Sequence, residues 1–436
     1  MAKILFLMRP EKGHLNSSLK IAKTLKSRGH KVVYLQLFEF EDYVRKEGFE
    51  FAPLFGEFFP RGCPVPRDYS ISLFAEVRRF FDQLAAGQHR TPQDFLKEEL
   101  NKVLEMVQPE LLIMDSYLAI PMMPAMPRNK PPCILLNSTI VDPYTETAFS
   151  YVAGMITLFL CPQEFDLPNQ HRLPEYHYVE ASCDLNRKET VDFPWERIDE
   201  GKKLVYCALG SQSHWSHEGA DLAEKLRNIQ KFLQAVINAL SDRTDCQLVM
   251  ATGMHLRAED FHSVPVNAVL VNETPQMAVL KKADLAITHG GLNSVKECIF
   301  FGVPMIVFPV TKEQSANAAR VIFNKIGVAA CINTASEETI RSLLAKIESD
   351  PGFKDRAAAM MEIFHKAERE QRAVTLIEET LTGQFSEPHI ADRQTLAGRR
   401  PRWFSRYPET SASPELQQTQ AQLPPGKASL TRKVGA

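Results

Sequence analysis

Two residues of this chain have the types and positions that proton transfer requires. His14 follows a short apolar run that ends at Met8, and Asp115 stands near the end of a second apolar run, Leu111–Ser116. Such runs predict parallel strands covered on both faces, whose carboxyl ends meet at one edge of a sheet. A carboxylate behind an imidazole fixes its tautomer, so the free ring nitrogen can take a proton from a hydroxyl. The pair therefore predicts a general base, whereas His14 alone would more often cap a helix or lie in a loop.

A second segment, in the other half of the chain, predicts a phosphate site. The run Leu285–Thr288 ends in His289-Gly290-Gly291 and passes directly into a helical pattern over residues 292–301. Two glycines let a bulky anion approach the backbone. A helix start adds unpaired N–H groups and the positive end of the helix dipole. His289 can donate to a diphosphate from the end of the strand.

Polar side chains at the start of this helix fit the same ligand. Asn293 and Ser294 can donate to phosphate oxygens. Glu297 lies one turn further on the same face, where a carboxylate can accept from ribose hydroxyls. Each of the three has a plainer explanation as a cap or a solvated helix residue, but the combination at this spacing favours a nucleotide site.

Two further loops are expected at the same cleft. Glu313 and Gln314 follow the apolar run Met305–Phe308. An acid beside an amide suits hydrogen bonds to vicinal sugar hydroxyls, although a surface loop leading into a helix explains the pair equally well. Gly210 and Ser211 close another apolar run and should face the same cleft.

The elements that must position these residues alternate between short apolar runs and amphipathic stretches. This alternation predicts an α/β protein with doubly wound parallel sheets and right-handed crossovers. The pattern restarts near residue 203, after a charged, proline-containing segment at 192–201. We therefore predict an N-terminal Rossmann-like domain over residues 1–196 and a C-terminal one over 201–383, which face each other across a cleft. Residues 384–436 lack apolar periodicity and are predicted to be a disordered tail.

Composition narrows the class of protein. The 436 residues exceed what one hydrophobic core usually serves, and a formal charge of −2 gives no reason to expect nucleic acid or an anionic membrane as a partner. The eight cysteines contain no CxxC pair and fit the reduced core residues of a cytoplasmic protein. No apolar stretch approaches the length of a membrane span, so stable membrane insertion is not expected. The sequence also lacks an Asp-x-Asp motif that could carry a divalent metal.

The motifs together resemble those of a known family. Their order and spacing are similar to the family 1 UDP-glycosyltransferases of the GT-B fold, and to the bacterial macrolide and natural-product branch in particular. The N-terminal half fits as well, so the resemblance covers roughly residues 1–380. The shared motifs are Pro275-Gln276, His289-Gly290-Gly291 with Asn293-Ser294 and Glu297, Gly302-Val303-Pro304, and Glu313-Gln314 with Asn317.

The resemblance implies a role for each residue of the donor half. Gln276 would lie near the uracil and the ribose, and Glu297 would hold the ribose. Glu313 and Gln314 would read the hydroxyls of the sugar. The residues that would hold the diphosphate are Ser211, His289, Gly291, Asn293 and Ser294.

The resemblance also implies the reaction. An inverting, metal-independent glycosyltransferase would move a hexose from a UDP-sugar to a hydroxyl of a hydrophobic small molecule, with His14 as catalytic base and Asp115 as its partner. The UDP-sugar would be a co-substrate, and no cofactor is expected. Plant members stack the uracil on a Trp two residues before the Pro-Gln pair. That position is Glu273 here, which leaves UDP against TDP open.

The acceptor is expected in the N-terminal half, near residues 55–90 and 117–155. Flexible apolar side chains in these segments suit a hydrophobic small molecule, although ordinary core packing explains part of the set. The candidate acceptor-binding residues are Phe55, Phe58, Phe59, Phe80, Phe81, Met122, Met123, Met126, Phe149 and Tyr151.

Two other functions remain open for the whole chain. One is a UDP-sugar 2-epimerase, and the other is a catalytically silent partner protein of the same fold.

Overall fold

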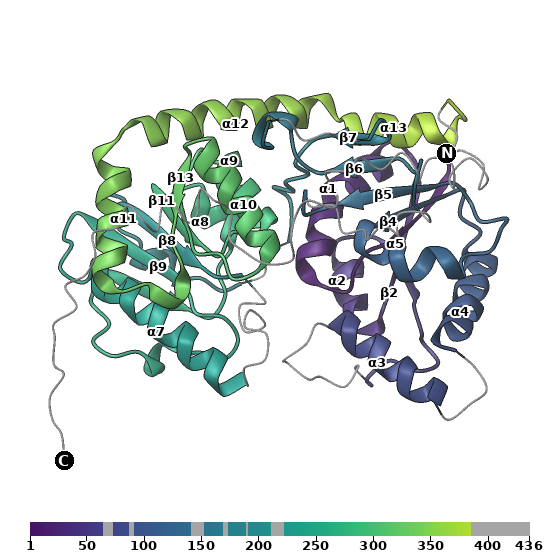
Figure 1. Ribbon diagram of the computed structural model, residues 1–436, viewed down its shortest axis with the longest axis horizontal. Helices are drawn as coiled ribbons and strands as arrows, with labels where there is room; N and C mark the ends of the chain where they lie inside the picture. The colour runs from purple at the N-terminus through teal and green to yellow at the C-terminus, as the bar shows by residue number, and fades with distance from the viewer. Residues whose placement is uncertain are drawn as a thin grey trace, which may run out of the picture.

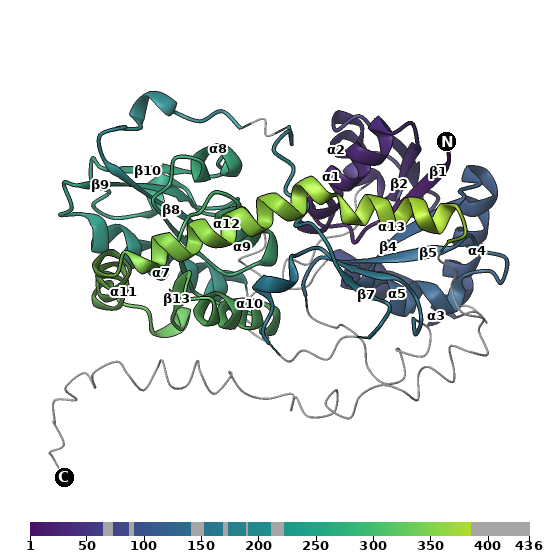
Figure 2. The same ribbon diagram turned by 90° about the horizontal axis from the view of Figure 1, so that it is seen from above.

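The computed structural model describes residues 1–63, 73–86, 91–140, 152–168, 173–188, 191–210 and 222–384. Two α/β domains lie side by side, and the long helix α12 (Gly352–Glu370) runs along one side of the molecule (Figures 1 and 2). Every strand pairing in both sheets is parallel. The predicted α/β class with two parallel sheets is therefore confirmed.

The first sheet has seven strands in the order β3-β2-β1-β4-β5-β6-β7. The order reverses between β1 and β4, so the loops that leave these two strands diverge and open a crevice at their carboxyl ends. The strands are β1 (Lys3–Leu7), β2 (Lys31–Gln36), β3 (Glu50–Pro53), β4 (Leu111–Asp115), β5 (Cys133–Asn137), β6 (Thr157–Phe159) and β7 (Tyr176–Tyr178). The helices are α1 (Lys12–Ser27), α2 (Glu41–Lys46), α3 (Leu73–Ala86), α4 (Pro92–Val107) and α5 (Ser116–Met122).

The second sheet repeats this arrangement with six strands in the order β10-β9-β8-β11-β12-β13. Its reversal lies between β8 and β11, which places the loops after these strands opposite the crevice of the first domain. The strands are β8 (Lys203–Ala208), β9 (Cys246–Ala251), β10 (Ala268–Val271), β11 (Leu285–Thr288), β12 (Met305–Val307) and β13 (Gly327–Ala329). The helices in this half of the chain are α7 (Leu222–Leu240), α8 (Gln276–Leu280), α9 (Leu292–Phe300), α10 (Lys312–Phe323), α11 (Glu337–Ser349), α12 and α13 (Arg372–Leu381).

The strands are apolar throughout because both faces of each sheet are covered. Along β1, Ile4 and Phe6 pack into a cluster with α1 and α13, whereas Leu5 and Leu7 pack into a cluster with α3, α4 and α5. Alternate residues of a strand point to opposite faces, so a strand buried on both sides loses the polar alternation of an exposed one. This burial is the physical reason for the continuous apolar runs of the sequence.

The last helix departs from the predicted domain boundaries. The sequence assigned residues 201–383 to the C-terminal domain, but α13 packs against the first domain, beside α1 (Figure 2). The chain turns at Gln371, whose φ of 50° interrupts the helix between α12 and α13. The second domain therefore ends before α13. The residues of α13 buried in the core of the first domain are Ala373, Val374, Leu376 and Ile377.

The two domains share a buried interface as well as this helix. Phe159 and Phe165 of the first domain belong to the same apolar cluster as α9 and β12 of the second. Beside them, the Arg320 Nε donates to the Asp166 Oδ1 at 2.7 Å, and both side chains are buried. This contact holds the two crevices face to face.

Two other expectations concern the ends and the surroundings of the chain. The tail predicted to be disordered, residues 384–436, lies outside the described residues apart from Gln384. Among the helices that the structure describes, none combines the length and the apolar character needed to cross a membrane.

Candidate active site

A cleft of about 420 Å³ lies between the two domains, at the carboxyl ends of the central strands. It brings together most of the residues that the sequence singled out, although they come from both halves of the chain. Asp115 lies behind His14 rather than on the wall, and Ser211 lies outside the described residues. The predicted residues that line the cleft are His14, Gln276, His289, Gly291, Asn293, Ser294, Glu297, Glu313 and Gln314.

His14 and Asp115 form a hydrogen-bonded pair at the wall of the first domain. His14 lies in the first turn of α1, and its Nδ1 is 2.6 Å from the Oδ2 of Asp115, the last residue of β4. Asp115 is fully buried, and its other oxygen accepts from the backbone N–H of Tyr117 at 3.0 Å, which caps α5. The carboxylate therefore fixes the tautomer with hydrogen on Nδ1 and leaves Nε2 to act as a base.

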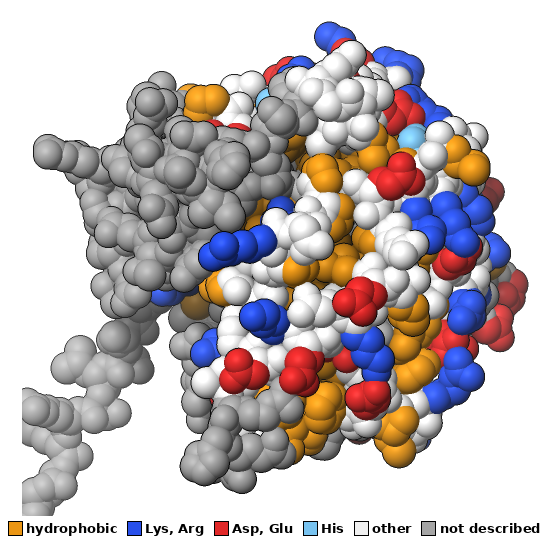
Figure 3. All heavy atoms as spheres, turned by 90° about the vertical axis from the view of Figure 1, so that its right-hand side faces the viewer, with side chains coloured by type: hydrophobic (Ala, Val, Ile, Leu, Met, Phe, Trp, Pro, Cys, Tyr) orange, Lys and Arg blue, Asp and Glu red, His pale blue; other side chains and the backbone are white. Residues whose placement is uncertain are grey.

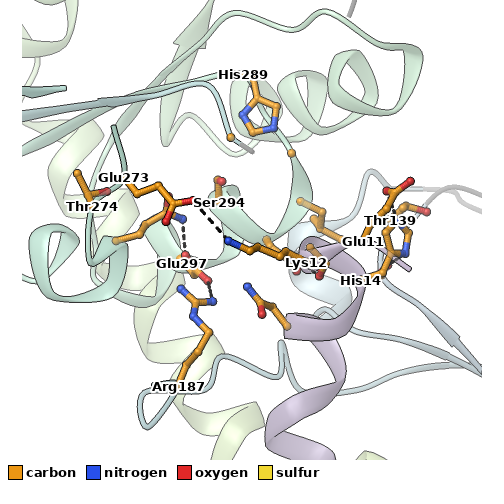
Figure 4. A pocket seen from close by; sticks show the side chains of 18 of the residues that line it. Glu11, Lys12, His14, Thr139, Arg187, Glu273, Thr274, His289, Ser294 and Glu297 are labelled. Atoms are coloured by element: carbon orange, nitrogen blue, oxygen red, sulfur yellow. Dashed lines mark hydrogen bonds and ion pairs between the residues drawn. The ribbon is translucent and has the colours of Figure 1, made fainter. Parts of the chain in front are cut away.

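Two residues that the sequence did not single out complete this wall. The Glu11 Oε2 lies 3.8 Å from the Nε2 of His14, and the Ser138 Oγ lies 3.2 Å from its Nδ1. Glu11 is 6% exposed and forms an ion pair with Arg9 at 2.9 Å. Glu11, His14 and Thr139 gather at one end of the cleft (Figure 4). Glu11 stands in the same loop as His14, so the loop sequence carried a signal for it, whereas nothing in the sequence marked Ser138.

The environment of His14 sets the pH range in which it can accept a proton. Burial by itself lowers the pKa of the imidazole, but the negative charge and hydrogen bond of Asp115, with the charge of Glu11, outweigh it. The pKa of His14 is therefore raised above its ordinary value. Because a base must be neutral to accept a proton, its working range starts at a higher pH than that of a free histidine.

This electrostatic balance predicts a pH profile. We expect the acid limb of kcat/KM to lie above pH 6.5, the ordinary pKa of histidine, because His14 is protonated below its raised pKa. In Asp115→Asn the largest raising contribution is removed while burial remains, so the limb should move to lower pH and kcat should fall. Rate measurements from pH 5 to 9 at constant ionic strength test this, and a limb unmoved by the substitution would contradict it.

On the opposite wall, the loop from β11 to α9 holds the predicted phosphate site. Gly291 precedes α9 without a side-chain cap, and Gly291, Leu292 and Asn293 line the cleft, so the start of the helix borders it. His289 stands at the end of β11, and burial lowers its pKa to about 4. His289 is therefore neutral near pH 7 and would meet a diphosphate as an N–H donor rather than as a cation.

The glycines around His289 have a packing role that the sequence did not indicate. A Cβ added at Gly291 would lie 2.5 Å from the Nε2 of His289, and one at Gly210 would lie 2.6 Å from its Cε1. Gly210 also has a φ of +76°, which side chains rarely adopt. The imidazole thus occupies the space that side chains at these positions would need.

Glu297, on the wall formed by the second domain, pairs through both of its carboxylate oxygens. It is 5% exposed, its Oε1 accepts from the Nη1 of Arg187 at 2.9 Å, and its Oε2 accepts from the amide of Gln276. Gln276 in turn accepts from the hydroxyl of Tyr206 at 3.1 Å. The sequence predicted Gln276 and Glu297 at one site, and the structure joins them directly. No sequence motif pointed to Arg187.

Two predicted donor residues are engaged in ways that narrow their roles. The Asn293 Nδ2 donates to the backbone oxygen of Gly13 at 2.6 Å, which links α9 to the loop that carries His14. The Gln314 Oε1 accepts from the backbone N–H groups of Val310 at 2.8 Å and Thr311 at 3.2 Å, which caps α10. Only the amide nitrogen of Gln314 is left to contact a sugar.

Glu313 is placed as the sequence predicted, on the wall of the cleft. Its Oε1 accepts from the Nδ2 of Asn317 at 3.0 Å, and burial raises the pKa of its carboxyl above the ordinary value. The backbone N–H of Leu292 also stabilises the charged form of this carboxyl. Each carboxylate oxygen has two lone pairs, so the carboxyl can still accept from a ligand hydroxyl. Of the two residues predicted to read the sugar, Glu313 is therefore the better placed.

The acceptor candidates that the structure describes lie outside this cleft. The rings of Phe55 and Phe81 pack at a tilt with centroids 4.5 Å apart, and those of Phe59 and Phe80 do so with centroids 4.8 Å apart. Phe55, Phe59 and Phe81 are buried in the core of the first domain. None of the described candidates lines the cleft between the domains. Apolar composition predicted their burial but not whether they faced a core or a ligand. Phe149 and Tyr151 lie outside the described residues.

The comparisons with known proteins decide the family. A family model described as UDP-glucoronosyl and UDP-glucosyl transferase matches residues 146–380, more than half of the chain. The chain belongs to this UDP-glycosyltransferase family. It is therefore a glycosyltransferase, as predicted, and membership favours transfer over both alternatives, epimerisation and a silent partner protein.

Individual proteins that resemble this glycosyltransferase are themselves named as glycosyltransferases or, in one case, as a synthase. It is 24% identical to NDP-glycosyltransferase YjiC of Bacillus licheniformis, over 85% of this chain and 95% of the relative. It is 22% identical to 4'-demethylrebeccamycin synthase of Lentzea aerocolonigenes, over 86% of this chain and 99% of the relative. The solved glycosyltransferase of kitacinnamycin superposes with a TM-score of 0.66 at 24% identity, over 87% of this chain and 98% of the solved one. This likeness confirms the predicted GT-B fold.

Proposed function

We propose that this glycosyltransferase moves a hexose from a UDP-sugar to a hydroxyl of a hydrophobic small molecule, with inversion at the anomeric carbon. The observation that carries the proposal is the single cleft in which the His14–Asp115 pair of one domain faces the His289 loop and the start of α9 in the other. A base on one wall and an anion site on the other suit displacement of a diphosphate.

The chain's own residues supply each requirement of this reaction. The Nε2 of His14 removes the proton of the acceptor hydroxyl, whose oxygen attacks the anomeric carbon as the bond to the diphosphate breaks. The electron pair of that bond leaves with UDP. The N–H groups at the start of α9 and the neutral His289 stabilise the departing diphosphate. Asp115 stabilises the imidazolium that His14 becomes.

The class of acceptor is proposed from the relatives. The names of the Lentzea relative and of the solved neighbour each contain a natural product, rebeccamycin and kitacinnamycin. A hydrophobic natural product or a lipid-like aglycone fits the same kind of reaction here.

Recognition of the nucleotide base is a separate question. Glu273 stands where plant members stack the base on Trp. Its side chain is half exposed and pairs with Lys12 at 3.4 Å. We propose that backbone and apolar groups hold the nucleotide base in place of a stacked Trp.

A screen of donors against acceptors, read by mass spectrometry, tests this function. UDP- and TDP-sugars are each incubated with a panel of phenolic, macrolide and lipid-like alcohols. We expect products heavier by one hexose residue, with an inverted anomeric configuration by NMR. Conversion of a UDP-sugar without any acceptor would indicate an epimerase instead.

The proposal includes catalysis without a metal ion. Among the described residues, no group of three or more His, Cys, Asp or Glu side chains could hold one. We expect activity to be unchanged in excess EDTA, because the helix start and His289 are placed to stabilise the leaving diphosphate. Complete loss of activity in EDTA, restored by Mg²⁺ or Mn²⁺, would contradict this assignment.

A further inference from the structure

The carboxylate expected to hold the ribose is already paired on both oxygens. Glu297 accepts from Arg187 on Oε1, at 2.9 Å, and from Gln276 on Oε2. Figure 4 shows Arg187 reaching Glu297 from a loop on the side of the cleft opposite His289. A carboxylate oxygen has two lone pairs, so each can still accept a hydrogen bond from a ribose hydroxyl. The ion pair therefore leaves the ribose position usable.

The loop that carries Arg187 is fastened to the first domain. The Nζ of Lys23, on α1, donates to Asp184 and to Glu47, each at 2.6 Å. The backbone N–H of Lys188 donates to the same Glu47 at 3.0 Å. These bonds flank Arg187 on both sides, and its side chain is only 12% exposed. The guanidinium that pairs with Glu297 is thus carried by a loop bonded to the first domain.

We propose that Arg187 is a positioning residue that widens the donor range of this enzyme. It keeps the buried Glu297 paired when a nucleotide lacks one ribose hydroxyl, so the cleft accepts 2'-deoxyribonucleotide donors as well as ribonucleotide donors. This inference rests on the proposed function, in which Glu297 meets the ribose.

The physical reason lies in what happens to Oε1 when a nucleotide covers it. Binding strips water from this oxygen, and a buried carboxylate oxygen without a partner is costly. With Arg187 present, Oε1 keeps its ion pair whether or not the hydroxyl is there. Without Arg187, the hydroxyl becomes the partner that replaces water, so its absence leaves Oε1 unpaired. A site built around such a group rejects the analogue that lacks the hydroxyl.

The test compares nucleotides that differ by one hydroxyl. Isothermal titration calorimetry measures UDP, 2'-deoxy-UDP and 3'-deoxy-UDP binding to the wild type, Arg187→Met and Arg187→Lys. For the hydroxyl that meets Oε1, we expect the ratio of deoxy-UDP to UDP dissociation constants to rise about tenfold or more in Arg187→Met, as for loss of one hydrogen bond to a charged group. Arg187→Lys keeps the charge and should restore part of the wild-type ratio.

A matched control separates this effect from loss of positive charge. Arg128 is exposed and precedes β5 at the end of the strand away from the cleft, so Arg128→Met should keep the wild-type ratios. Equal ratios in Arg187→Met and the wild type for both deoxynucleotides would overturn the inference and leave the proposed function standing. Tighter UDP binding by Arg187→Met would also overturn it, since the ion pair would then compete with the ribose. A wild type that binds none of the three nucleotides would overturn the proposed function itself.

Discussion

Replacing His14 with alanine should lower turnover by about 10²–10⁴-fold, the usual contribution of a positioned general base. Donor binding should be nearly unchanged, because the residues that face the nucleotide come mainly from the second domain and from Arg187. Steady-state rates and calorimetry with UDP measure the two effects separately. Lost UDP affinity with turnover retained would assign His14 to the donor site instead.

The same substitution removes the imidazole from the Oδ2 of the fully buried Asp115, so stability must be measured beside activity. His14→Gln is the useful second variant, because its amide can still donate to Asp115 but cannot accept the hydroxyl proton at neutral pH. His262→Ala, which removes an exposed histidine on the second domain, is the matched control and should change neither rate nor affinity. Turnover near wild type in His14→Gln would show that the position matters for packing rather than for proton transfer.

The parts of this structure that follow from local rules could be predicted from the sequence. The run Leu285–Thr288 coincides with β11, and Ala268–Val271 with β10, because strands buried on both faces have few polar residues and end sharply at glycine or asparagine. His14 follows β1, and Asp115 is the last residue of β4, the neighbour of β1 in the sheet. Their contact was therefore implied by the rule that parallel strands share a carboxyl edge.

For Gln314, the helix-start alternative stated beside the sugar-binding one describes part of the side chain's role. Thr311 and Gln314 form a Thr-x-x-Gln capping box, the standard signature of a helix start. That pattern predicts that the Oε1 of Gln314 bonds to the backbone, as it does with Val310 and Thr311, and leaves the amide nitrogen for a ligand. The aromatic residues near Phe55 illustrate a different problem, since apolar composition cannot distinguish a core from a binding pocket.

Other features depend on contacts that no local pattern contains. Arg187 lies in an aperiodic segment, and its partner Glu297 is 110 residues away on another domain. The amphipathic pattern of α13 shows that one face is buried but not which domain buries it. Its crossing to the first domain depends on the turn at Gln371 and on the length of α12. Such pairings are decided by tertiary packing, which sequence periodicity does not encode.

Glu297→Ala should have the second largest effect, on donor affinity rather than on turnover. The substitution removes a charged acceptor of ribose hydrogen bonds, and such bonds contribute about 1.5–3 kcal/mol, or roughly 10- to 150-fold in affinity. It also leaves the guanidinium of Arg187, itself only 12% exposed, without the carboxylate that balances it. Titration of UDP into the wild type and the variant measures the change directly.

The controls separate ribose binding from the loss of the ion pair. Glu297→Gln keeps the shape of the side chain and an oxygen for Arg187 but removes the charge, so its affinity should fall between those of the wild type and Glu297→Ala. Glu362→Ala removes an exposed carboxylate from α12 and should change stability by less than about 0.5 kcal/mol and UDP affinity not at all. If Glu297→Ala binds 2',3'-dideoxy-UDP as weakly as UDP, the lost affinity comes from the ribose hydroxyls. An unchanged UDP dissociation constant would instead mean that Glu297 serves only to join the domains through Arg187, and the ribose must then lie elsewhere along α9.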